Sequence, residues 1–457
     1  MPANKPRLRA LLLAAGKGTR MRSRLPKVLH PLAGQPMLLH ALAAARAAGD
    51  EQPTLVIGHE GEQIRAAVGE QAAYVEQTEQ LGTGHAVAQA RAALQDKADL
   101  VLVTSADMPL LEAETLQRLV DAQTQHDGPF TMLTVVQDNP RGFGRILRAA
   151  PGGPVQAIIE EAEATSEQLA ITELNVGTYC FRADWLWSAL DKLSPSEKKG
   201  EYYLTDLVAI AVDAGEAVAA LVLDDAEQAI GVNTREHLAQ AEAALRYRIL
   251  RGHMLAGVTI QDPATTYIDA SVSIGQDTII KPNTTIEGAT VIGDENVIGP
   301  NCVIRDSQIG DHCILDGSYI EGARIENHVD VGPFAHLRKG AHLQDHVHIG
   351  NYAELKNSVM GPGSKMGHNS YLGDATVGAN VNIGAGTITA NYDGVNKKPT
   401  VIEDGAFIGV DSMLVAPLKI GQGARTGAGA GVTKDVPAYT LVVGMPARAI
   451  RKLEGHD

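Results

Sequence analysis

Residues 268–304 read IDASVSIGQDTIIKPNTTIEGATVIGDENVIGPNCVI, and this stretch decides the fold of the second half of the chain. An isoleucine stands at every sixth position, seven times in succession: Ile268, Ile274, Ile280, Ile286, Ile292, Ile298 and Ile304. Six residues advance an α-helix by about 600°, which scatters these side chains over different faces, and a single strand alternates every two residues. The strict period, with Gly after several isoleucines, is instead typical of a hexapeptide β-helix. Chance spacing in an ordinary strand-rich domain is the alternative, which seven residues in register disfavour.

The six-residue ladder slips after Ile304 and resumes twice, so the array covers most of residues 260–436. Its later rungs are Val331, Leu337, Leu343, Ile349, Leu355, Met366 and Leu372, then Ile402, Ile408, Leu414, Ile420, Thr426 and Val432. The segment NYDGVNKKP at 391–399 is polar and off-register, which predicts a loop that leaves one coil. Insertions in repeat folds commonly carry function.

The bulk composition fits a multidomain protein that contains a thin solenoid. A chain of 457 residues is too long for one ordinary core, and it combines 4% aromatic residues with 47 glycines. The net charge of −15 argues against nucleic acid or an anionic membrane as the main partner, although a local basic cluster can still bind phosphate.

The cysteines and the N-terminus predict a cytoplasmic protein. Cys180, Cys302 and Cys313 form no CxxC pair and are expected to be buried, reduced thiols. The first residues lead straight into a strand-like run without the apolar region of a signal peptide, and no apolar stretch reaches membrane-spanning length.

The first half repeats a strand–loop–helix pattern. Residues 8–15 form a continuous apolar run, as in a strand of a buried parallel sheet, and 54–57 and 99–104 are two further strands. Residues 38–48 form an Ala-rich helix. The alternation predicts an α/β nucleotide-binding domain, Rossmann-like and doubly wound, that binds ligands at the carboxyl ends of its strands.

A loop with two glycines, GKGTRM at 16–21, follows the first strand. Its glycines would let the backbone approach a phosphate, and Arg20 and Lys27 add the positive charge that a departing pyrophosphate needs. The loop is neither GxGxxG nor Walker A, and by itself it fits a plain turn equally well.

Two polar residues after strand-like segments have a choice of roles. Asp107 either caps the turn before Pro109 or binds Mg²⁺, a cation that takes one or two carboxylates together with substrate phosphates. Asn233 either caps a helix or provides a second metal ligand, and both roles are compatible.

Several segments of the first half resemble sugar-1-phosphate nucleotidyltransferases. LAAGxGTRM at 13–21 followed by Pro26-Lys27 resembles the fingerprint of that family, and Gln77 with LGTGH at 81–85 matches the segment that reads uracil. GFGRI at 142–146, Glu160, Asn175 and GEYYLTD at 200–206 continue the match in order. The resemblance implies that Asp107 and Asn233 are the Mg²⁺ ligands.

The segment 234–256 changes character and predicts a connecting helix. Leu238, Ala241, Leu245 and Ile249 follow a helical stripe, with charged residues away from it. The predicted domains are therefore 1–233, a helical linker at 234–256, and a β-helix at 257–457.

Basic residues of the β-helix are informative because three hexads per coil stack residues eighteen apart, at roughly 4.8 Å. Arg338 and Lys356 are eighteen apart and should lie on one face in neighbouring coils. Like charges at such a distance repel unless an anion lies between them, and a phosphate is the natural anion. The alternative is that both side chains splay into solvent.

Histidines are dense in the same region. His336, His342 and His348 are six apart and should point to different faces, so they cannot form a metal cluster within one chain. His368 lies three residues before Tyr371, where a neutral imidazole could take a proton from an ammonium group.

Both halves together resemble the bifunctional N-acetylglucosamine-1-phosphate uridyltransferase/glucosamine-1-phosphate N-acetyltransferase family. The specific strings are LGD at 372–374, NIGAGT at 382–387 and NYDG at 391–394. The resemblance implies acetylation of glucosamine-1-phosphate by acetyl-CoA in the C-terminal domain, then coupling to UTP with release of pyrophosphate in the N-terminal domain. It also implies Mg²⁺, a left-handed β-helix that forms a homotrimer, and a place in the synthesis of peptidoglycan and other cell-envelope precursors.

The resemblance assigns roles residue by residue. It makes His368 the catalytic base, lets Arg338, Lys356 and Tyr371 hold the sugar phosphate and Asn382 the sugar, and places Glu354 in the same site. Acetyl-CoA would bind at Ala385, Asn391, Tyr392 and Ala428. UTP and the uridine-diphosphate sugar would bind at Leu13, Ala14, Ala15, Gly16, Arg20, Lys27, Gln77, Gly82, Thr83, Asp107, Gly144, Glu160, Asn175 and Asn233.

The chain departs from the family pattern at Ala106, Ala162, Val410 and Met445, which affects substrate and cofactor contacts rather than the class of reaction. Two other functions are open: a nucleotidyltransferase whose β-helix is a passive spacer, and a sugar-nucleotide-binding scaffold without catalysis. The His368 and Arg338/Lys356 pattern disfavours the first, and intact Arg20, Lys27 and Asp107 disfavour the second.

Overall fold

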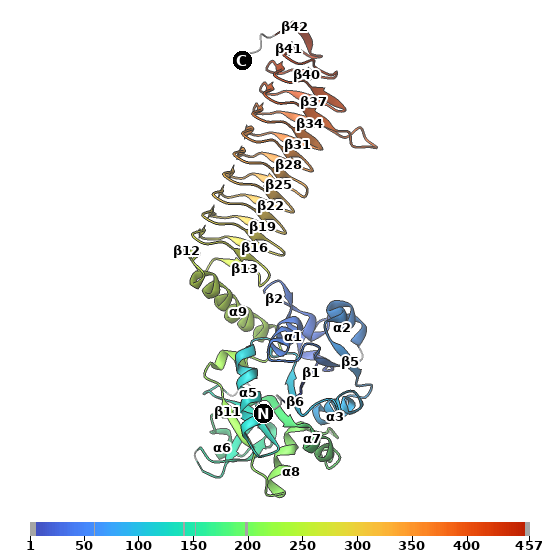
Figure 1. Ribbon diagram of the computed structural model, residues 1–457, viewed down its shortest axis with the longest axis vertical. Coiled ribbons are helices and arrows are strands. Elements are labelled where there is room, and N and C mark those ends of the chain that lie inside the picture. Colours follow the sequence, from blue (N-terminus) through green and yellow to red (C-terminus); the bar gives the residue numbers. More distant parts are fainter. Residues whose placement is uncertain (1–5, 59, 140–141, 151, 197–199, 453–457) are drawn as a thin grey trace, which may run out of the picture. The chain divides into compact units, whose positions relative to one another are not determined.

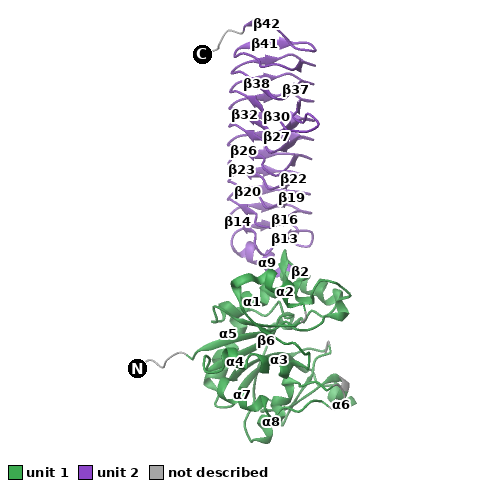
Figure 2. Cartoon of the chain, turned by 90° about the vertical axis from the view of Figure 1, so that its right-hand side faces the viewer, with its two compact units in different colours: residues 1–245 green, residues 246–457 purple. Residues whose placement is uncertain are grey.

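The computed structural model describes residues 6–58, 60–139, 142–150, 152–196 and 200–452; of Ala162, only the backbone is described. The chain divides into two compact units, Met1–Leu245 and Arg246–Asp457 (Figure 2). Helix α9, Arg235–Leu255, covers the segment for which the connecting helix was predicted and contains this division. The domain limits 1–233, 234–256 and 257–457 stay predictions.

The N-terminal unit is built on a nine-stranded sheet whose central order is β11-β7-β10-β6-β1-β4-β5. Its strands are β1 Leu8–Leu13, β4 Thr54–Ile57, β5 Ala73–Glu76, β6 Leu100–Ser105, β7 Phe130–Val136, β8 Arg145–Arg148, β9 Val155–Ile159, β10 Glu173–Arg182 and β11 Ala219–Val222, beside a separate hairpin of β2 Pro31–Leu32 and β3 Gln35–Pro36. Strands β1, β4, β5 and β6 are parallel, as the apolar runs indicate, whereas β10 lies antiparallel to β6 and β7.

Helices connect these strands and bury the apolar side chains of the sheet. They are α1 Met37–Ala47, α2 Gly61–Val68, α3 Thr83–Gln89, α4 Arg91–Leu94, α5 Ala113–Gln125, α6 Ser166–Leu169, α7 Ala183–Leu190 and α8 Leu207–Asp213. Two apolar clusters form the core, one containing Leu12 and Leu102 and the other Leu11 and Val103. Consecutive residues of β1 and of β6 thus enter different clusters, which explains why both strands are apolar throughout.

The C-terminal unit is a stack of short parallel strands, visible as a ladder in Figure 1. Ile268 pairs with Ile286 and then Ile304, while Ile280 pairs with Ile298, so the six-residue period places every third isoleucine in the same sheet. Ile280, Ile286, Ile298 and Ile304 are fully buried. The hexapeptide β-helix predicted from the ladder is confirmed.

Three sheets, here called the first, second and third face, make up this β-helix, and their strands are parallel except β42, which lies antiparallel to β41. The first face contains β12 Thr259–Ile260, β15 Ile279–Ile280, β18 Val297–Ile298, β21 Ile314–Leu315, β24 Asp330–Val331, β27 His348–Asn351, β30 Lys365–His368, β33 Asn382–Ile383, β36 Phe407–Ile408, β39 Arg425–Thr426, β41 Thr440–Val443 and β42 Arg448–Lys452. The second contains β13 Tyr267–Ile268, β16 Thr285–Glu287, β19 Val303–Arg305, β22 Tyr319–Glu321, β25 His336–Leu337, β28 Glu354–Lys356, β31 Tyr371–Gly373, β34 Ile388–Ala390, β37 Met413–Val415 and β40 Gly431–Val432. The third contains β14 Ser273–Ile274, β17 Val291–Ile292, β20 Gln308–Ile309, β23 Arg324–Ile325, β26 His342–Leu343, β29 Val359–Met360, β32 Ala375–Val377, β35 Thr400–Ile402 and β38 Leu418–Ile420.

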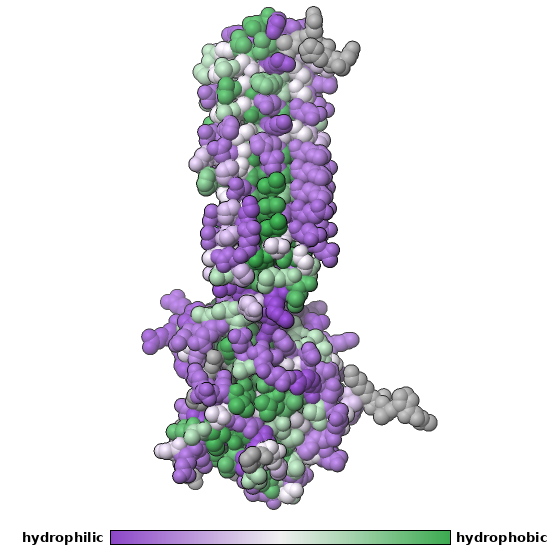
Figure 3. Space-filling model, turned by 90° about the vertical axis from the view of Figure 1, so that its left-hand side faces the viewer, coloured by the Kyte–Doolittle hydropathy of each residue, from purple (hydrophilic) through white to green (hydrophobic). Residues whose placement is uncertain are grey.

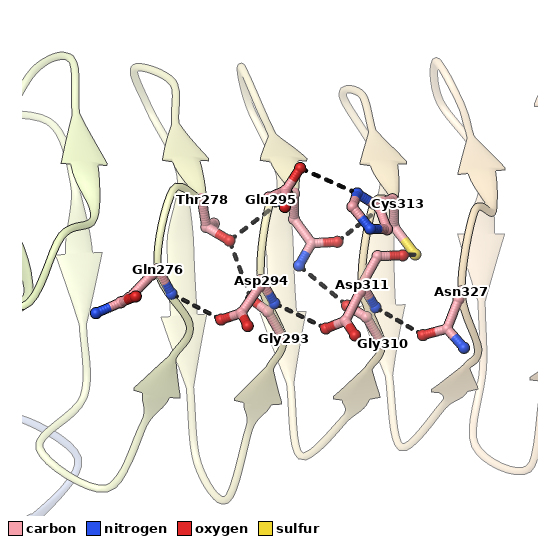
Figure 4. A network of polar contacts seen from close by, with 11 residues as sticks. Gln276, Thr278, Gly293, Asp294, Glu295, Gly310, Asp311, Cys313 and Asn327 are labelled. Atoms are coloured by element: carbon pink, nitrogen blue, oxygen red, sulfur yellow. Dashed lines mark hydrogen bonds and ion pairs between the residues drawn. The ribbon is translucent and has the colours of Figure 1, made fainter.

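A ladder of side chains ties the turns of successive coils together (Figure 4). The backbone N–H of Gln276 donates to Asp294 Oδ1 at 2.8 Å, that of Asp294 to Asp311 Oδ1 at 2.8 Å, and that of Asp311 to Asn327 Oδ1 at 2.9 Å. A Cβ on Gly293 would lie 2.0 Å from Asp311 Oδ1. The Gly that follows Ile292 therefore leaves space for the carboxylate of the next coil.

The slip of the ladder and the inserted loop are both present. Ile304 pairs with Ile320, two residues short of a full period, and the eighteen-residue register returns where Ile325 pairs with Leu343. Thr389 pairs with Leu414, so the coil between them is longer than the others and contains residues 391–399 as an insertion. This loop projects from the stack beside β34 (Figure 1). All three cysteines are free and buried, as predicted.

Candidate functional site

A cavity of about 620 Å³ lies in the N-terminal unit, at the carboxyl ends of β1 and β6. It is lined by Leu13, Ala14, Ala15, Gly16, Lys27, Gln77, Gly82, Thr83, Asp107, Gly144, Glu160, Asn175 and Asn233. These are all the residues predicted for the nucleotide site except Arg20, which contacts one of them. Residues from segments far apart in the sequence thus meet at one end of the sheet, where α/β folds bind their ligands.

Four charged and polar side chains converge at one edge of this cavity. The Lys27 ammonium donates a very short hydrogen bond to Asp107 Oδ2 and a second one, of 3.1 Å, to Asn233 Oδ1. Arg20 Nη2 donates to the same Asn233 oxygen at 3.0 Å. Asp107 Oδ2 and Asn233 Oδ1 therefore both lie within hydrogen-bond distance of the same ammonium group, that of Lys27.

This pair of oxygens fits a Mg²⁺ ion that receives its remaining ligands from water and phosphate. Magnesium is bound in many phosphoryl-transfer sites by one or two carboxylates plus substrate oxygens rather than by a complete protein cage. No group of three or more His, Cys, Asp or Glu side chains within the described ranges could hold a metal by itself.

The loop at 16–21 reaches the cavity in a tight turn. Gly18 has φ of 60°, and a Cβ there would lie 2.6 Å from the Lys27 Cβ, whereas a Cβ on Gly16 would meet nothing within 4 Å. Gly18 lets Lys27 pack closely, and Gly16 leaves its backbone open to a ligand. Residues Thr19–Met21 continue as a short 3-10 helix that carries Arg20.

The second loop is braced by the segment at 200–206. Gln77 is buried, and its amide donates to Gly82 O and contacts His85 Nδ1, both at 3.1 Å. The backbone N–H of Leu204 donates to Thr83 Oγ1 at 3.0 Å. A Cβ on Gly82 would lie 2.5 Å from Tyr202 O, so only Gly allows these two segments to meet.

The predicted sugar-binding pair, Glu160 and Asn175, lines the same cavity. Asn175 is 8% exposed, and its amide already donates to Tyr179 Oη at 2.9 Å and accepts from the N–H of Gly177 at 3.0 Å. Burial raises the pKa of Tyr179, which keeps that phenol neutral. Thr205 donates to Glu160 Oε1 at 3.4 Å. Of the departures, Ala106 is fully buried and the Ala162 side chain lies outside the described residues.

In the C-terminal unit, the predicted acetyltransfer residues gather around the second face. Glu354 in β28 pairs with Tyr371 in the next strand, β31, so both lie on this face. His368 ends β30, at the corner where the first face leads into the second. Arg338 follows β25, and Lys356 ends β28, at the opposite edge.

The exposed His368 imidazole is oriented by an asparagine of the preceding coil. Asn351 pairs with His368 in the sheet, and Asn351 Oδ1 lies 2.5 Å from His368 Nδ1. An amide oxygen accepts, so Nδ1 carries a proton, and in the neutral form of the ring the lone pair is then on Nε2. Nε2 is therefore the ring nitrogen that can act as a base toward a ligand on the second face.

The basic pair is confirmed as neighbours in space, and the structure adds two charges to it. Arg338 Nη1 donates to Glu354 Oε1 at 2.8 Å. The Lys397 ammonium from the 391–399 loop, and then the Arg338 guanidinium, lower the pKa of Lys356. The cluster therefore contains three cations, Arg338, Lys356 and Lys397, beside the Glu354 carboxylate. Lys397 could not be predicted from the eighteen-residue spacing.

The acetyl-CoA residues are divided between the two edges of the second face. Ile383 pairs with Ile408, which places Ala385 and Val410 at the same corner column as His368. Ala428 follows one coil later. Asn391 lies at the other edge, where its Nδ2 donates to Asp374 Oδ2 at 2.6 Å, and Tyr392 is 61% exposed in the loop.

Asn382 and Met445 lie apart from this arrangement. Asn382 pairs with Lys365 and Phe407 on the first face, so one chain does not bring it to the second face with Glu354 and Tyr371. Met445 is 75% exposed. The separate faces of His336, His342 and His348 are confirmed, because these residues begin strands of the second, third and first face.

Comparisons with known proteins match one protein family in each of the two units. Residues 10–205 match the MobA-like NTP transferase domain family, and residues 271–306 match the bacterial transferase hexapeptide family (six repeats). A bifunctional protein GlmU from Heliobacterium modesticaldum is 50% identical over 95% of this chain and 94% of its own length. The chain belongs to the GlmU family. Bifunctional GlmU proteins from Geobacillus sp. and Bacillus subtilis are 48% and 46% identical, each over 97% of this chain and 96% and 97% of their own lengths.

Membership of the GlmU family confirms a bifunctional enzyme of UDP-N-acetylglucosamine synthesis, with a uridyltransferase and an acetyltransferase activity. The hexapeptide match is consistent with the left hand expected for the β-helix. None of the described helices combines the length and apolar character that a membrane crossing requires.

Proposed function

We propose that the cavity of the N-terminal unit carries out uridylyl transfer and that the second face of the β-helix carries out acetyl transfer. The observation that supports this is the separate gathering of the two residue sets: Lys27, Asp107 and Asn233 in one unit, and Glu354 and His368 in the other. Acetyl transfer produces the acetylated sugar phosphate, and this product is the acceptor in uridylyl transfer. Acetyl transfer therefore comes before uridylyl transfer.

In uridylyl transfer, the sugar phosphate attacks the α-phosphorus of UTP in line and pyrophosphate leaves, without a covalent enzyme intermediate. Asp107 and Asn233 would hold Mg²⁺, which supplies Lewis-acid stabilisation of the phosphate oxygens. Arg20 and Lys27 face the charge that develops on the pyrophosphate. The open backbone of Gly16 approaches the phosphates, and Gln77, Gly82 and Thr83 bind the base.

In acetyl transfer, His368 Nε2 takes a proton from the amine of glucosamine-1-phosphate as nitrogen attacks the thioester carbonyl of acetyl-CoA and the coenzyme A thiolate leaves. Asn351 holds the ring in the tautomer that this step needs. Arg338, Lys356 and Lys397 bind the sugar phosphate, with Tyr371 beside them. Asn382 contacts the sugar, and Ala385, Asn391, Tyr392 and Ala428 contact acetyl-CoA.

A homotrimer through the β-helix accounts for two features of the isolated chain. The side of the β-helix drawn in Figure 3 carries an apolar band along its coils. Asn382 lies on a different face from Tyr371, so it reaches a sugar bound on the second face only across neighbouring copies. We place the enzyme in the cytoplasm, where reduced cysteines are stable, and in the supply of precursors for peptidoglycan and other cell-envelope polymers.

Incubation with acetyl-CoA, glucosamine-1-phosphate, UTP and Mg²⁺ tests this function. Free thiol should appear first, and pyrophosphate should follow only when acetyl-CoA is present or when the acetylated sugar phosphate is added directly. Pyrophosphate release without thiol release from the non-acetylated sugar would contradict the proposed order.

A further inference from the structure

The Lys27 ammonium occupies the place between the two oxygens that are proposed to hold the metal. It donates to both Asp107 Oδ2 and Asn233 Oδ1, and Arg20 donates to Asn233 Oδ1 as well. The Lys27 and Asp107 side chains are only 12% and 15% exposed, so water screens this ion pair weakly. Without ligands, the negative charge of the site is already compensated by the protein itself.

The packing of Lys27 fixes its stem and leaves only its end free to move. Residues Lys27–Leu29 form a short 3-10 helix in which Val28 and Leu29 are buried. The Lys27 Cβ lies under Gly18, where there is no room for a second Cβ. A change in the partner of Lys27 therefore requires rotation along its side chain and no movement of the backbone.

We propose that Lys27 is the resident cation of the metal site and that it is exchanged for a divalent ion when nucleotide binds. A divalent cation beside the same oxygens would be strongly repelled by the ammonium at hydrogen-bond distance. The phosphates of UTP offer Lys27 another anion within reach, because Gly16, Lys27 and Asp107 line one cavity. The free enzyme then binds divalent ions weakly, and the productive ligand is the metal–nucleotide complex.

This inference rests on the proposed function, since it assumes that Asp107 and Asn233 are the metal ligands. It adds a linkage between nucleotide and metal that the ligand set alone does not require. A preformed pair of oxygens without a competing cation would bind the ion before the nucleotide.

Titration of the full-length protein with Mn²⁺, followed by the electron paramagnetic resonance signal of free Mn²⁺, measures metal binding without turnover. In the absence of nucleotide, Lys27→Met should bind Mn²⁺ about tenfold or more tightly than the wild type, because the competing charge is removed. Lys27→Arg, which keeps the charge, should stay weak. Lys17→Met is the matched control, since Lys17 lines the same cavity as Lys27 but, within the described residues, makes no hydrogen bond to either oxygen; it should bind Mn²⁺ like the wild type.

The titration is repeated with UTP present and no sugar phosphate. The wild type should then bind Mn²⁺ at least as tightly as Lys27→Met does without UTP. Equal Mn²⁺ affinity of the wild type and Lys27→Met in the absence of UTP overturns the exchange, and Lys27→Gln provides a second neutral variant if Lys27→Met is unfolded by circular dichroism. If Asp107→Asn leaves Mn²⁺ binding with UTP unchanged, the proposed metal site itself is wrong, which separates the two failures.

Discussion

The N-terminal cavity and the second face of the β-helix assemble their charged side chains in different ways. Lys27 and Asp107 are 80 residues apart in sequence, and three separate segments bring Lys27, Asp107 and Asn233 to one point. In the β-helix, Arg338 and Glu354 are 16 residues apart and belong to successive coils. A repeat converts sequence spacing directly into distance, whereas the α/β sheet brings remote segments together through its topology. Each site should therefore be removable without harm to the other.

His368→Ala should produce the largest difference between the two activities. Loss of a positioned general base should lower acetyl transfer by about 10²–10⁴-fold, because the amine loses its proton acceptor. Uridylyl transfer from added N-acetylglucosamine-1-phosphate should be unchanged. Thiol release from acetyl-CoA and pyrophosphate release are followed on the same preparation. Loss of both activities in a folded protein would contradict two independent sites.

Asp107→Ala is the reciprocal variant. Without the carboxylate, uridylyl transfer should fall by about 10²–10³-fold, since charge on the phosphates loses preorganised stabilisation. Acetyl transfer should remain at the wild-type rate. Formation of the uridine-diphosphate sugar at a normal rate by Asp107→Ala would show that the metal assignment is wrong.

Two adjacent residues of β23 sharpen the contrast between the inside and the outside of a coil. Ile325 is 2% exposed, whereas the side chain of Arg324 is 63% exposed and only 3.9 Å from Glu326 in a surface ion pair. Ile325→Ala should destabilise the β-helix by about 2–5 kcal/mol through the cavity it leaves. Arg324→Ala should change stability by no more than about 0.5 kcal/mol.

Guanidinium titration with residual acetyl transfer as the probe measures this pair of variants. The midpoint should fall for Ile325→Ala and stay at the wild-type value for Arg324→Ala, while the loss of uridylyl transfer follows one common curve. Similar midpoints for the two variants would mean that the coil is not held by its axial side chains.

The same contrast explains which features could be predicted from the sequence. The β-helix follows from the period of Ile268 to Ile304, and the Arg338/Lys356 neighbourhood follows from a spacing of eighteen. Asn351 was missed because its coil is one residue shorter, so it pairs with His368 at a spacing of seventeen. Lys397 was missed because a loop outside the register has no fixed position along the stack.

The N-terminal site could be predicted only through its motif. No periodicity connects Lys27 with Asp107 and Asn233, and the contact between them depends on the order of strands in the sheet. The antiparallel direction of β10 could not be predicted either. A strand that is buried on both faces is an apolar run in the sequence whether it is parallel or antiparallel to its neighbours. Resemblance to a family supplied what local patterns could not.

The smallest expected effect concerns a half-buried histidine of the N-terminal unit, His40, in contrast to the exposed His368 of the β-helix. Burial lowers the pKa of His40 from its ordinary value of 6.5, although the Leu32 carbonyl and Glu242 oppose this. His40 Nε2 lies 2.8 Å from Leu32 O, and Nδ1 lies 3.2 Å from the Gln35 amide nitrogen, so the neutral ring donates at one nitrogen and accepts at the other. Protonation would replace that acceptor with a second donor.

Because the folded-state pKa of His40 lies below the unfolded value, the unfolded chain binds more protons as pH falls below 6.5, and folding stability decreases in that range. The midpoint for loss of uridylyl-transfer competence on heating should therefore fall between pH 7 and pH 5 (roughly the window in which histidine titrates). His40→Gln, which can still donate to Leu32 O, should reduce this slope and leave the stability at pH 7 close to the wild-type value. The conservative change keeps the neutral contacts and removes only the titration, so a steeper fall in His40→Gln than in the wild type would show that the imidazole is stabilised by its proton rather than by burial in neutral form.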